Sequence, residues 1–474
     1  MKKDDLKKIL SLEGYINILK IEKVKDKDKE DALNVYVMSN KKKIKCPECM
    51  KYTSTIHDRL RPSKVLYLNN SGQKTYLIVT KRRFKCTSCN KRITEDLNLT
   101  TNGSNISLKV KQKVLKDFMD ADKTVKRISL DNHISEDSTR QIFTQAMENY
   151  FEQIFYLPEI ISLDEKATYT NKGIYSLIIN DPIHRVTLDI LPNRTKEHLI
   201  KYFMQVKNRK NVKVVIIDLY ETYRQVVKRC FPNAMIVADP FHVVKLIEKA
   251  LDDIRLRKLK KYKEDKKSLE YNLLKNRVNK SLLLKSFDET RYEKKIKQNQ
   301  EKSYQEGRTN KKPNNKYLDF WYGTIKIKKN DKFIEVTRIS RLHEILNLDE
   351  ELYTAYNLKE EFFRIINNVK YEDKKEAIIK FSKQCKESNI TEMMKVSKTI
   401  NNWLEEIVNS QKDEKYNNGF TEANNNKIDK IISVSYGYKN FDFFRKRALV
   451  ILQKSYSGSP KKNRNLANSK LTKK

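Results

Sequence analysis

The chain has 474 residues, with 99 Lys or Arg against 61 Asp or Glu, so its formal net charge is +38. At about 100–200 residues per domain this length excludes a single small module. The content of 38% hydrophobic residues, with 25 Tyr and 18 Phe, excludes a chain that is disordered throughout. A compact body of this charge repels itself unless a polyanion is its normal partner, and nucleic acid is the first candidate.

The sequence gives no sign of a membrane or of an oxidising compartment. It holds no apolar run of the about 18 residues that a membrane span needs. Its first segment mixes acids and lysines through the apolar positions, which argues against a secretory signal. Six cysteines are too few for a disulfide framework. We therefore expect a cytoplasmic, nucleoid-associated protein without a membrane partner.

The N-terminal part predicts a zinc ribbon. Four cysteines form two Cys-x-x-Cys pairs, which together supply the four thiolates of a structural Zn²⁺ site. They are Cys46, Cys49, Cys86 and Cys89. The pairs are 36 residues apart, more than the usual about 15–20, and the β-rich runs VLYLNN and TYLIVTKRRFKC lie between them. We expect an amphipathic lead-in at 1–45 and a zinc ribbon with an enlarged hairpin at 46–100. A coincidence without metal is the alternative, and Cys230 and Cys385 are expected to be buried thiols.

Residues 107–150 have helical periodicity and predict three short helices. Ser135 is a good N-cap residue and is followed by two acids, which the helix dipole favours in a first turn. This pattern fits a helix-turn-helix DNA reader, and a helical spacer is the alternative. If the third helix packs through Ile142, Phe143 and Ala146, the outward side chains that could contact DNA are Thr139, Arg140, Gln141 and Thr144.

Residues 158–250 alternate strands and helices in the order three strands, helix, strand, helix, strand. This order predicts a mixed sheet of the ribonuclease H-like type. Two of the strands end on an acid, IISLD at Asp164 and VVIID at Asp218. Neighbouring strand ends of this kind could share a divalent cation, with a third carboxylate from Glu422. Strand-end aspartates are also often caps, so the residues alone leave this point open.

The remainder of the chain predicts an all-helical, lysine-rich insertion at 251–411, with a mobile loop at 298–317. A block at 412–452 completes the core, and residues 453–474 form a basic disordered tail. The expected fold is thus multidomain α/β.

Several segments resemble one family in collinear order. They include CPEC and RRFKCTSC, LDEKATYTNKGIYSLIIND with Asn193 and Arg194, IIDLYETYRQVVKRCFPNAMIVADPFHVVKLI, LYTAYNLKEEFF, WLEEIVNS and NNGFTEANNNKI. They resemble transposases of the insertion-sequence L-three (ISL3) family, which are DDE enzymes. The resemblance implies a ribonuclease H-like core interrupted by a helical insertion, and an N-terminal zinc ribbon and helix-turn-helix that bind the element's terminal repeats.

The resemblance implies that Asp164, Asp218 and Glu422 are the catalytic acids, holding two Mg²⁺ for which Mn²⁺ could substitute. Asp239 and His242 of DPFH would support the site, and a role as part of the packing is the alternative for them. Asn425 would orient metal-bound water. Glu405 and Glu406 remain alternatives for the third acid. The sequence departs from the family pattern at Ala423, where the family has glycine, and at Asp429, Ile432 and Ser433, where it tends to be basic.

The expected function is that of a DNA transposase of a bacterial insertion sequence. Such an enzyme binds terminal inverted repeats, hydrolyses a phosphodiester at each element end, and joins the freed 3′-hydroxyl to target DNA. Because two ends must be cut and joined together, a homodimer or higher oligomer is expected. One alternative is a DNA-binding regulator with an inactive or domesticated core, and another is a host nuclease of ribonuclease H-like fold.

Overall fold

The computed structural model describes residues 7, 10, 12–26, 29–70, 73–101, 103–148, 156–287, 320–329, 332–416 and 419–454. The loop expected at 298–317 lies outside these residues, as does the expected tail from residue 455 onward. Among the described helices, none combines the length and the apolar character that crossing a bilayer requires. The chain divides into two units, residues 1–153 with 168–174 and 425–474, and residues 154–167 with 175–424.

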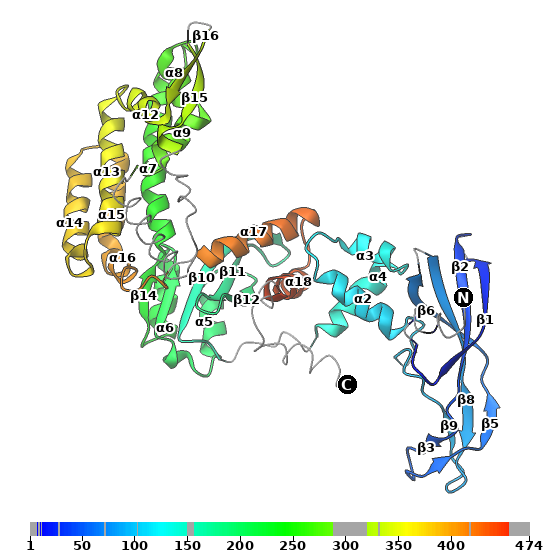
Figure 1. The fold of residues 1–474 in the computed structure, drawn as a ribbon. Helices are drawn as coiled ribbons and strands as arrows, with labels where there is room; N and C mark the ends of the chain where they lie inside the picture. Colours follow the sequence, from blue (N-terminus) through cyan, green and yellow to red (C-terminus); the bar gives the residue numbers. More distant parts are fainter. Residues whose placement is uncertain are drawn as a thin grey trace, which may run out of the picture. The chain divides into compact units, whose positions relative to one another are not determined.

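The first unit begins with a four-stranded sheet in the order β1-β2-β7-β6 (Figure 1). Its strands are β1 (Ile16–Lys25), β2 (Asp31–Ser39), β6 (Ser63–Asn70) and β7 (Gln73–Thr80). Side chains alternate across β2, so Val35 and Val37 lie in the core while their neighbours are partly exposed. The structure corrects the lead-in expected at 1–45, because β2 pairs in parallel with β7 over seven residue pairs and so belongs to the same sheet.

Short strands frame the four cysteines and are fastened by a buried ion pair. The strands are β3 (Ile44–Lys45), β4 (Tyr52–Thr53), β5 (Ile56–Arg59), β8 (Arg82–Lys85) and β9 (Arg92–Thr94). Arg82 donates to both carboxylate oxygens of Glu95, with a closest approach of 2.8 Å, and also to Ser39 Oγ at 3.2 Å. The two charged side chains are 9% and 1% exposed. The pair therefore joins the strands around the cysteines to the end of β2.

The three short helices predicted at 107–150 are present as α2 (Leu108–Phe118), α3 (Val125–Asp131) and α4 (Glu136–Ala146). Ser135 caps α4 as expected, since its hydroxyl accepts from the Ser138 N–H at 3.1 Å. Phe118 and Phe143 stack at 4.2 Å between ring centroids, and Phe443 of α18 (Phe441–Lys454) packs edge-on against both. The C-terminal helix thus completes the core of this unit.

The second unit contains a mixed five-stranded sheet in the order β12-β11-β10-β13-β14. Its strands are β10 (Ile160–Thr170), β11 (Gly173–Asp181), β12 (Val186–Leu191), β13 (Val214–Ile217) and β14 (Met235–Ala238). The helices between them are α5 (Lys196–Met204), the short 3₁₀-helix Arg209–Asn211, and α6 (Glu221–Cys230). The predicted order of strands and helices is confirmed. Ile161 and Leu163 of β10 share one core with the buried side chains of α5 and α6.

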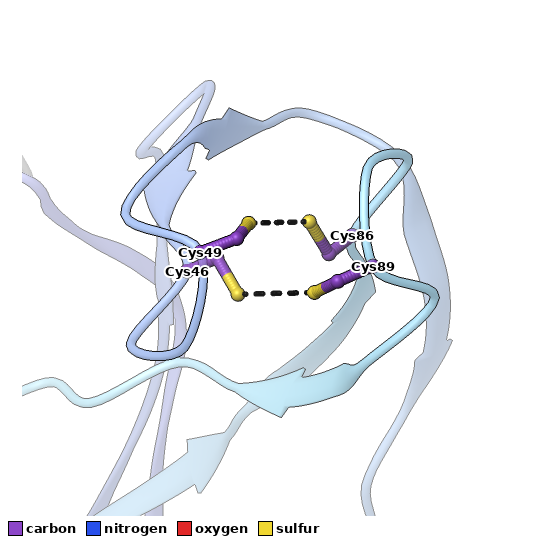
Figure 2. Close-up of side chains that lie close together, drawn as sticks. All are labelled: Cys46, Cys49, Cys86 and Cys89. Carbon is purple, nitrogen blue, oxygen red and sulfur yellow. Dashed lines mark hydrogen bonds between the residues drawn. The ribbon is translucent and has the colours of Figure 1, made fainter.

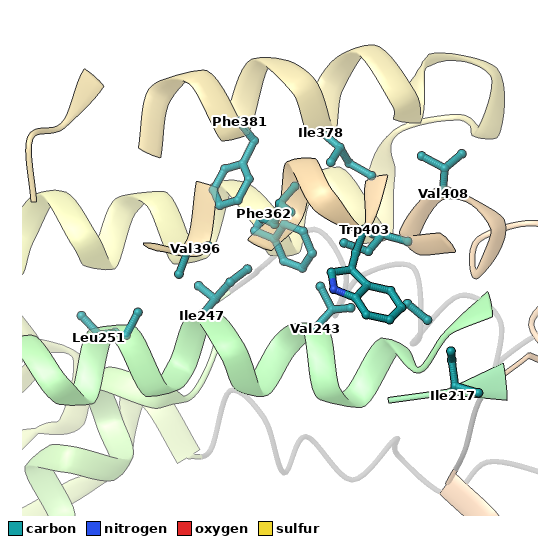
Figure 3. Packing of buried hydrophobic residues seen from close by; sticks show 14 of the residues in the cluster. Ile217, Val243, Ile247, Leu251, Phe362, Ile378, Phe381, Val396, Trp403 and Val408 are labelled. Carbon is teal, nitrogen blue, oxygen red and sulfur yellow. The ribbon is translucent and has the colours of Figure 1, made fainter. Parts of the chain in front are cut away.

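Helices follow the sheet and share its core (Figure 3). Val243 and Ile247 of α7 pack with Phe362, Phe381 and other apolar side chains of the helices around it. Cys230 and Cys385 are buried thiols, as expected. The elements are α7 (Pro240–Lys261), α8 (Leu269–Lys275), α9 (Arg277–Leu284), β15 (Thr324–Lys329), β16 (Lys332–Thr337), α12 (Arg338–Leu346), α13 (Glu350–Asn368), α14 (Tyr371–Glu387), α15 (Thr391–Asn402) and α16 (Leu404–Asn409).

Two expectations for this region are corrected. The boundary drawn at residue 250 falls inside α7, which runs without a break from the end of the sheet because its apolar positions keep helical spacing. The segment 251–411 is also not all-helical, because β15 and β16 form an antiparallel pair. Alternation of β-branched and lysine residues in TIKIKK is typical of a strand.

The buried ion pair Arg82–Glu95 predicts a large effect on stability. Glu95→Ala would leave the Arg82 charge buried without its partner, which typically costs about 3–5 kcal/mol. The exposed neighbouring pair Arg83–Asp58, with side chains 35% and 39% exposed, is the matched control, and Asp58→Ala is expected to cost less than about 1 kcal/mol. Thermal melting of the zinc-loaded protein measures the stability of both variants. Equal decreases in melting temperature for Glu95→Ala and Asp58→Ala would contradict the larger contribution assigned to the buried pair.

Candidate functional site

The four cysteines converge on one point (Figure 2). The Sγ atoms of Cys46 and Cys89 are 3.6 Å apart, and those of Cys49 and Cys86 are 3.5 Å apart. A tetrahedral Zn²⁺ with Zn–S bonds of about 2.3 Å has sulfur–sulfur edges of about 3.8 Å. All four thiols are free. The donor set and its spacing therefore fit a structural zinc ion.

The two Cys-x-x-Cys turns have the same backbone geometry. Met50 and Asn90, each directly after the second cysteine of its pair, adopt the left-handed conformation with φ of 61° and 54°. The N–H of Cys46 bonds to the carbonyl of Lys51, and that of Cys86 to the carbonyl of Lys91, both at 2.8 Å. These turns aim backbone N–H groups at the sulfurs. Hydrogen bonds from the Cys89 and Ser88 N–H groups lower the pKa of Cys86 to about 6, which favours the thiolate that binds metal.

The second cluster consists of Asp164, Asp218 and His242, whose nearest ligand atoms all lie within 4.8 Å of one another. The strand register brings the two acids together. Ser162 of β10 pairs with Ile216 of β13 in parallel, and Asp164 and Asp218 lie two residues further along their chains. Both are buried, at 4% and 8% exposure. The two acids lie close together, but the expectation that both close a strand is wrong for Asp164, because β10 continues to Thr170, whereas Asp218 directly follows β13.

Asp239 and His242 reach the same place from the start of α7. The Asp239 carboxylate caps this helix by accepting from the Phe241 N–H at 3.0 Å. His242 Nε2 lies 3.1 Å from Asp218 Oδ1 and 3.8 Å from Asp239 Oδ2. Since β14 lies beside β13 and leads directly into α7, the sheet itself positions the imidazole. Asp239 thus has a capping role in addition to facing the cluster.

The Asp218 carboxyl group is electrostatically strained. Burial, followed by the charges of Asp164 and Asp239, raises the pKa of Asp218 to about 9. Its Oδ1 atom has no aligned hydrogen-bond donor among the described residues, although His242 Nε2 is close in distance. A buried carboxylate with a free lone pair beside a second acid is a site that a divalent cation would stabilise. The residues present therefore fit a hard metal ion.

A group that sequence reasoning did not assign lies next to these acids. Glu165 accepts from the Arg194 guanidinium and from the Tyr223 hydroxyl, the latter at 3.3 Å. Burial and the Glu165 charge raise the pKa of Tyr223, which keeps its hydroxyl protonated as a donor. The alternation of side chains along β10 could have indicated a separate role for Glu165, since this residue must point to the face opposite Asp164.

Glu422 lies in the first turn of α17 (Gly419–Val434), and its side chain is exposed. Its carboxylate is outside the Asp164–Asp218–His242 group. The preceding residue, Thr421, is buried, with its hydroxyl 3.4 Å from Ser162 Oγ and accepting from Asn180 Nδ2 at 3.2 Å. Because Ser162 and Asp164 share one face of β10, this turn of α17 packs on the face that carries Asp164. Asn425 follows one turn later and is half-buried.

The alternative third acids are engaged elsewhere. Glu406 is paired with Arg224 at 3.0 Å, and the Arg224 guanidinium lies over the Trp403 ring at 3.6 Å. Glu405 is paired with Lys375 at 2.6 Å. Both carboxylates therefore serve ion pairs of the helical region.

The predicted DNA-contacting residues of α4 divide into two groups. Arg140, Gln141 and Thr144 are exposed, as the helical pattern requires. The prediction for Thr139 is wrong, because its side chain is fully buried and its hydroxyl donates to the Ser135 carbonyl at 2.9 Å. Thr139 lies three and four residues before Ile142 and Phe143, so it shares their buried face.

Two comparisons of the sequence show which known proteins it resembles. Residues 161–448 match the family model of ISL3 DDE transposases, and residues 42–89 match that of the zinc finger of transposases IS204, IS1001, IS1096 and IS1165. The curated transposase for insertion sequence element IS1001 from Bordetella parapertussis is 32% identical over 130 residues, which are 26% of this chain and 32% of that protein. The chain thus spans about a third of the length of the relative that it matches.

The thiolate cluster predicts a specific metal requirement. Cys86→Ser removes one of four sulfur ligands, so zinc should be lost and the strands around the cysteines should unfold locally, because structural zinc supplies folding free energy. Zinc content and amide hydrogen exchange measure the two effects. Cys385→Ser, which alters a buried thiol in the other unit, should keep full zinc content. If purified wild-type protein contains no zinc, the assignment of the four cysteines as a zinc site would be contradicted.

The raised pKa of Asp218 predicts a stability gain on its removal. A folded-state pKa of about 9 against 3.8 for the unfolded chain means that Asp218 lowers stability increasingly as the pH rises between these values. In buffer without added Mg²⁺ or Mn²⁺, Asp218→Asn should therefore melt higher than wild type at pH 8, and the difference should shrink toward pH 5. The difference in the free energy of unfolding between the two proteins can change by at most about 1.4 kcal/mol per pH unit.

Asp252 is the matched control for this measurement. Although burial raises its pKa, hydrogen bonds from Lys280 and Arg255 outweigh that effect and lower it overall. Asp252→Asn should therefore lose stability at pH 8. Equal melting temperatures for Asp218→Asn and wild type across the series would show that the carboxyl cluster is not strained.

Proposed function

We propose that this chain, which belongs to the ISL3 family of transposases, is the DNA transposase of a bacterial insertion sequence. It binds the terminal inverted repeats, cleaves a phosphodiester at each end of the element, and transfers the strands to target DNA in the cytoplasm. The observation that carries this proposal is the buried meeting of Asp164 and Asp218 beside His242, with Asp164 within β10 and Asp218 directly after the adjacent parallel strand β13.

The order β12-β11-β10-β13-β14 supports a ribonuclease H-like core. In this proposal the first three strands form the antiparallel half and β13 and β14 the parallel half. The acids then lie at the carboxyl end of β13 and at the level of β10 beside it, and the helices from α8 to α16 are an insertion between this sheet and α17.

Asp164, Asp218 and Glu422 would hold two Mg²⁺ ions, for which Mn²⁺ could substitute. When bound, these ions would activate an attacking oxygen and stabilise the leaving oxygen in an in-line displacement. The burial of Asp164 and Asp218 keeps water from screening their charge. A divalent cation would offset the repulsion between these two carboxylates.

The surrounding side chains hold these acids in place. His242 Nε2 is close to both Asp218 and Asp239, so it can donate to one carboxylate and limit its rotation. Asn424, two residues after Glu422, donates to Thr187 Oγ1 at 2.8 Å, and Thr187 donates to Asn180 at 2.9 Å. This buried network holds the helix turn that carries Glu422 against the face of β10 that carries Asp164.

Glu422 is the third acid in this proposal because the carboxylates of the two alternative residues already have cationic partners. Glu405 and Glu406 are held in ion pairs with Lys375 and Arg224. The exposed Glu422 side chain lies next to the residue that contacts Ser162. Asn425 would lie on the same helical face and orient water.

DNA binding would involve the zinc ribbon and the exposed residues of α4, namely Arg140, Gln141 and Thr144. The net charge of +38 supports extensive phosphate contact. Two element ends must be cut and joined in one complex, which supports a homodimer or larger assembly.

A paired set of variants tests the catalytic assignment. Asp164→Asn and Glu422→Gln should each lower strand cleavage by orders of magnitude while DNA binding is kept, because each removes a carboxylate that stabilises the transition state. The substrate is a plasmid that carries the DNA flanking the reading frame, with Mg²⁺ or Mn²⁺ as cofactor. Nicks are mapped by primer extension.

The combined change Glu405→Gln with Glu406→Gln is the control and should leave cleavage within a few-fold of wild type. Full cleavage by Glu422→Gln, with loss in the control, would overturn the assignment of the third acid. Sequence-specific binding by wild-type protein without any cleavage would instead support the DNA-binding regulator.

A further inference from the structure

Two partly exposed tyrosines, Tyr175 and Tyr220, have no role in the chemistry described so far, and both contact Arg194, the partner of Glu165. Tyr175 lies on β11. Tyr220 is the N-cap residue of α6, two residues after Asp218, and its N–H donates to the Asp218 carbonyl at 2.7 Å. Both side chains are 39% exposed. Large aromatic surface left in water beside an active centre has no folding advantage, because its burial would be favourable. It is therefore a candidate for contact with a ligand.

Arg194 holds the two rings in place. Its guanidinium carbon lies 4.3 Å from the centroid of the Tyr175 ring and 5.2 Å from that of Tyr220. The Tyr220 ring also packs edge-on against the buried Tyr223, with centroids 5.1 Å apart. The planar cation therefore fixes the rings through contacts that are favourable on aromatic faces.

Arg194 itself is not suited to capture a free phosphate. Its charge is paired with Glu165, and Glu165 also accepts from Tyr223. The guanidinium is thus neutralised and oriented, and its main contribution is to the placement of the rings. A ligand of this site would be recognised by stacking.

Positive charge is supplied nearby by a groove between α5 and α6 that begins two residues after Arg194. The groove has a volume of about 840 Å³ and includes Lys196, Lys201, Lys228 and Arg229, against one acid, Glu197. Within the described part of the chain, no carboxylate pairs with any of these four cations. A row of unpaired cations along a groove is complementary to a nucleic acid backbone.

The geometry points to a binding site for an unpaired nucleotide of the DNA strand next to the cleavage position. Its base stacks on the Tyr175 and Tyr220 rings, which Arg194 positions, and its backbone continues into the α5–α6 groove. Stacking on tyrosine is tolerant of base identity, so the site takes any base that has left the duplex. This inference rests on the proposed function, because it places the strand by the catalytic acids.

The test uses the full-length, zinc-loaded protein without added Mg²⁺ or Mn²⁺, so that no strand is cut. The probe is a short duplex with one unpaired 2-aminopurine at its 3′ end, whose fluorescence falls when the base stacks. Wild-type protein should quench it. Tyr175→Ala and Tyr220→Ala should lose the quenching and bind this probe about tenfold more weakly, while their affinity for the blunt duplex stays unchanged.

Matched variants separate stacking from other effects. Tyr175→Phe and Tyr220→Phe keep the rings and should quench as wild type does. Tyr353→Ala removes a tyrosine of α13 that is 50% exposed, and it should also leave quenching intact. The pair Lys201→Glu with Lys228→Glu should weaken both duplexes and lower the salt slope by about 2, with quenching unchanged at saturation.

Full quenching by the two alanine variants would overturn the proposal, as would an equal loss in Tyr353→Ala. A loss of blunt-duplex binding in the alanine variants would also count against it, because stacking on an unpaired base cannot account for that loss. The result is independent of the proposed chemistry. If Asp164→Asn still cut DNA, the proposed function would fail while the quenching result stood.

Discussion

The close approach of two buried carboxyl groups is the constraint on which the second unit depends. Asp164 and Asp218 are brought level by the parallel pairing of β10 and β13, so this register fixes how closely their backbones approach. Their repulsion and burial oppose folding. The apolar core beneath them, which runs from the sheet into α7 and the helices around it, must outweigh this cost. The folded state therefore keeps an unfavourable interaction between the two carboxyl groups, and a bound cation would relieve it.

The same constraint explains the residues around the acids. Asp239 serves as the cap of α7 while facing the cluster, and His242 lies one turn later, within reach of Asp218. On the opposite face, Glu165 is neutralised by Arg194 and bonded by Tyr223. Without these partners the Glu165 charge would add to the repulsion at Asp218. Asp239 and Glu165 thus each have a hydrogen-bonding partner that fixes the direction of the carboxylate.

Sequence reasoning succeeded where chemistry depends on a local pattern. The spacing of the four cysteines predicted their convergence. The two aspartates suggested a shared cation only with the support of the family resemblance, and Asp164 lies within β10 rather than at its end. The misassignment of Thr139 ignored a local signal, because the helical period places this residue with the buried Ile142 and Phe143. Sequence reasoning also failed where pairing joins distant segments. The membership of β2 in the N-terminal sheet depends on its parallel pairing with β7, which no local signal reveals.

The helices α17 and α18 are synthesised late, and the interiors of the two units are complete only when these helices have been made. Thr421 contacts Ser162 across 259 positions of sequence, and Arg447 donates to the carbonyl of Lys123 across 324. Each unit thus lacks a piece of its interior until α17 and α18 have left the ribosome. Contacts so distant in sequence form last and slowly, because the intervening chain must first be ordered. A nascent or prematurely terminated chain that ends before residue 419 therefore has the cysteine cluster, Asp164 and Asp218 but not the turn that carries Glu422.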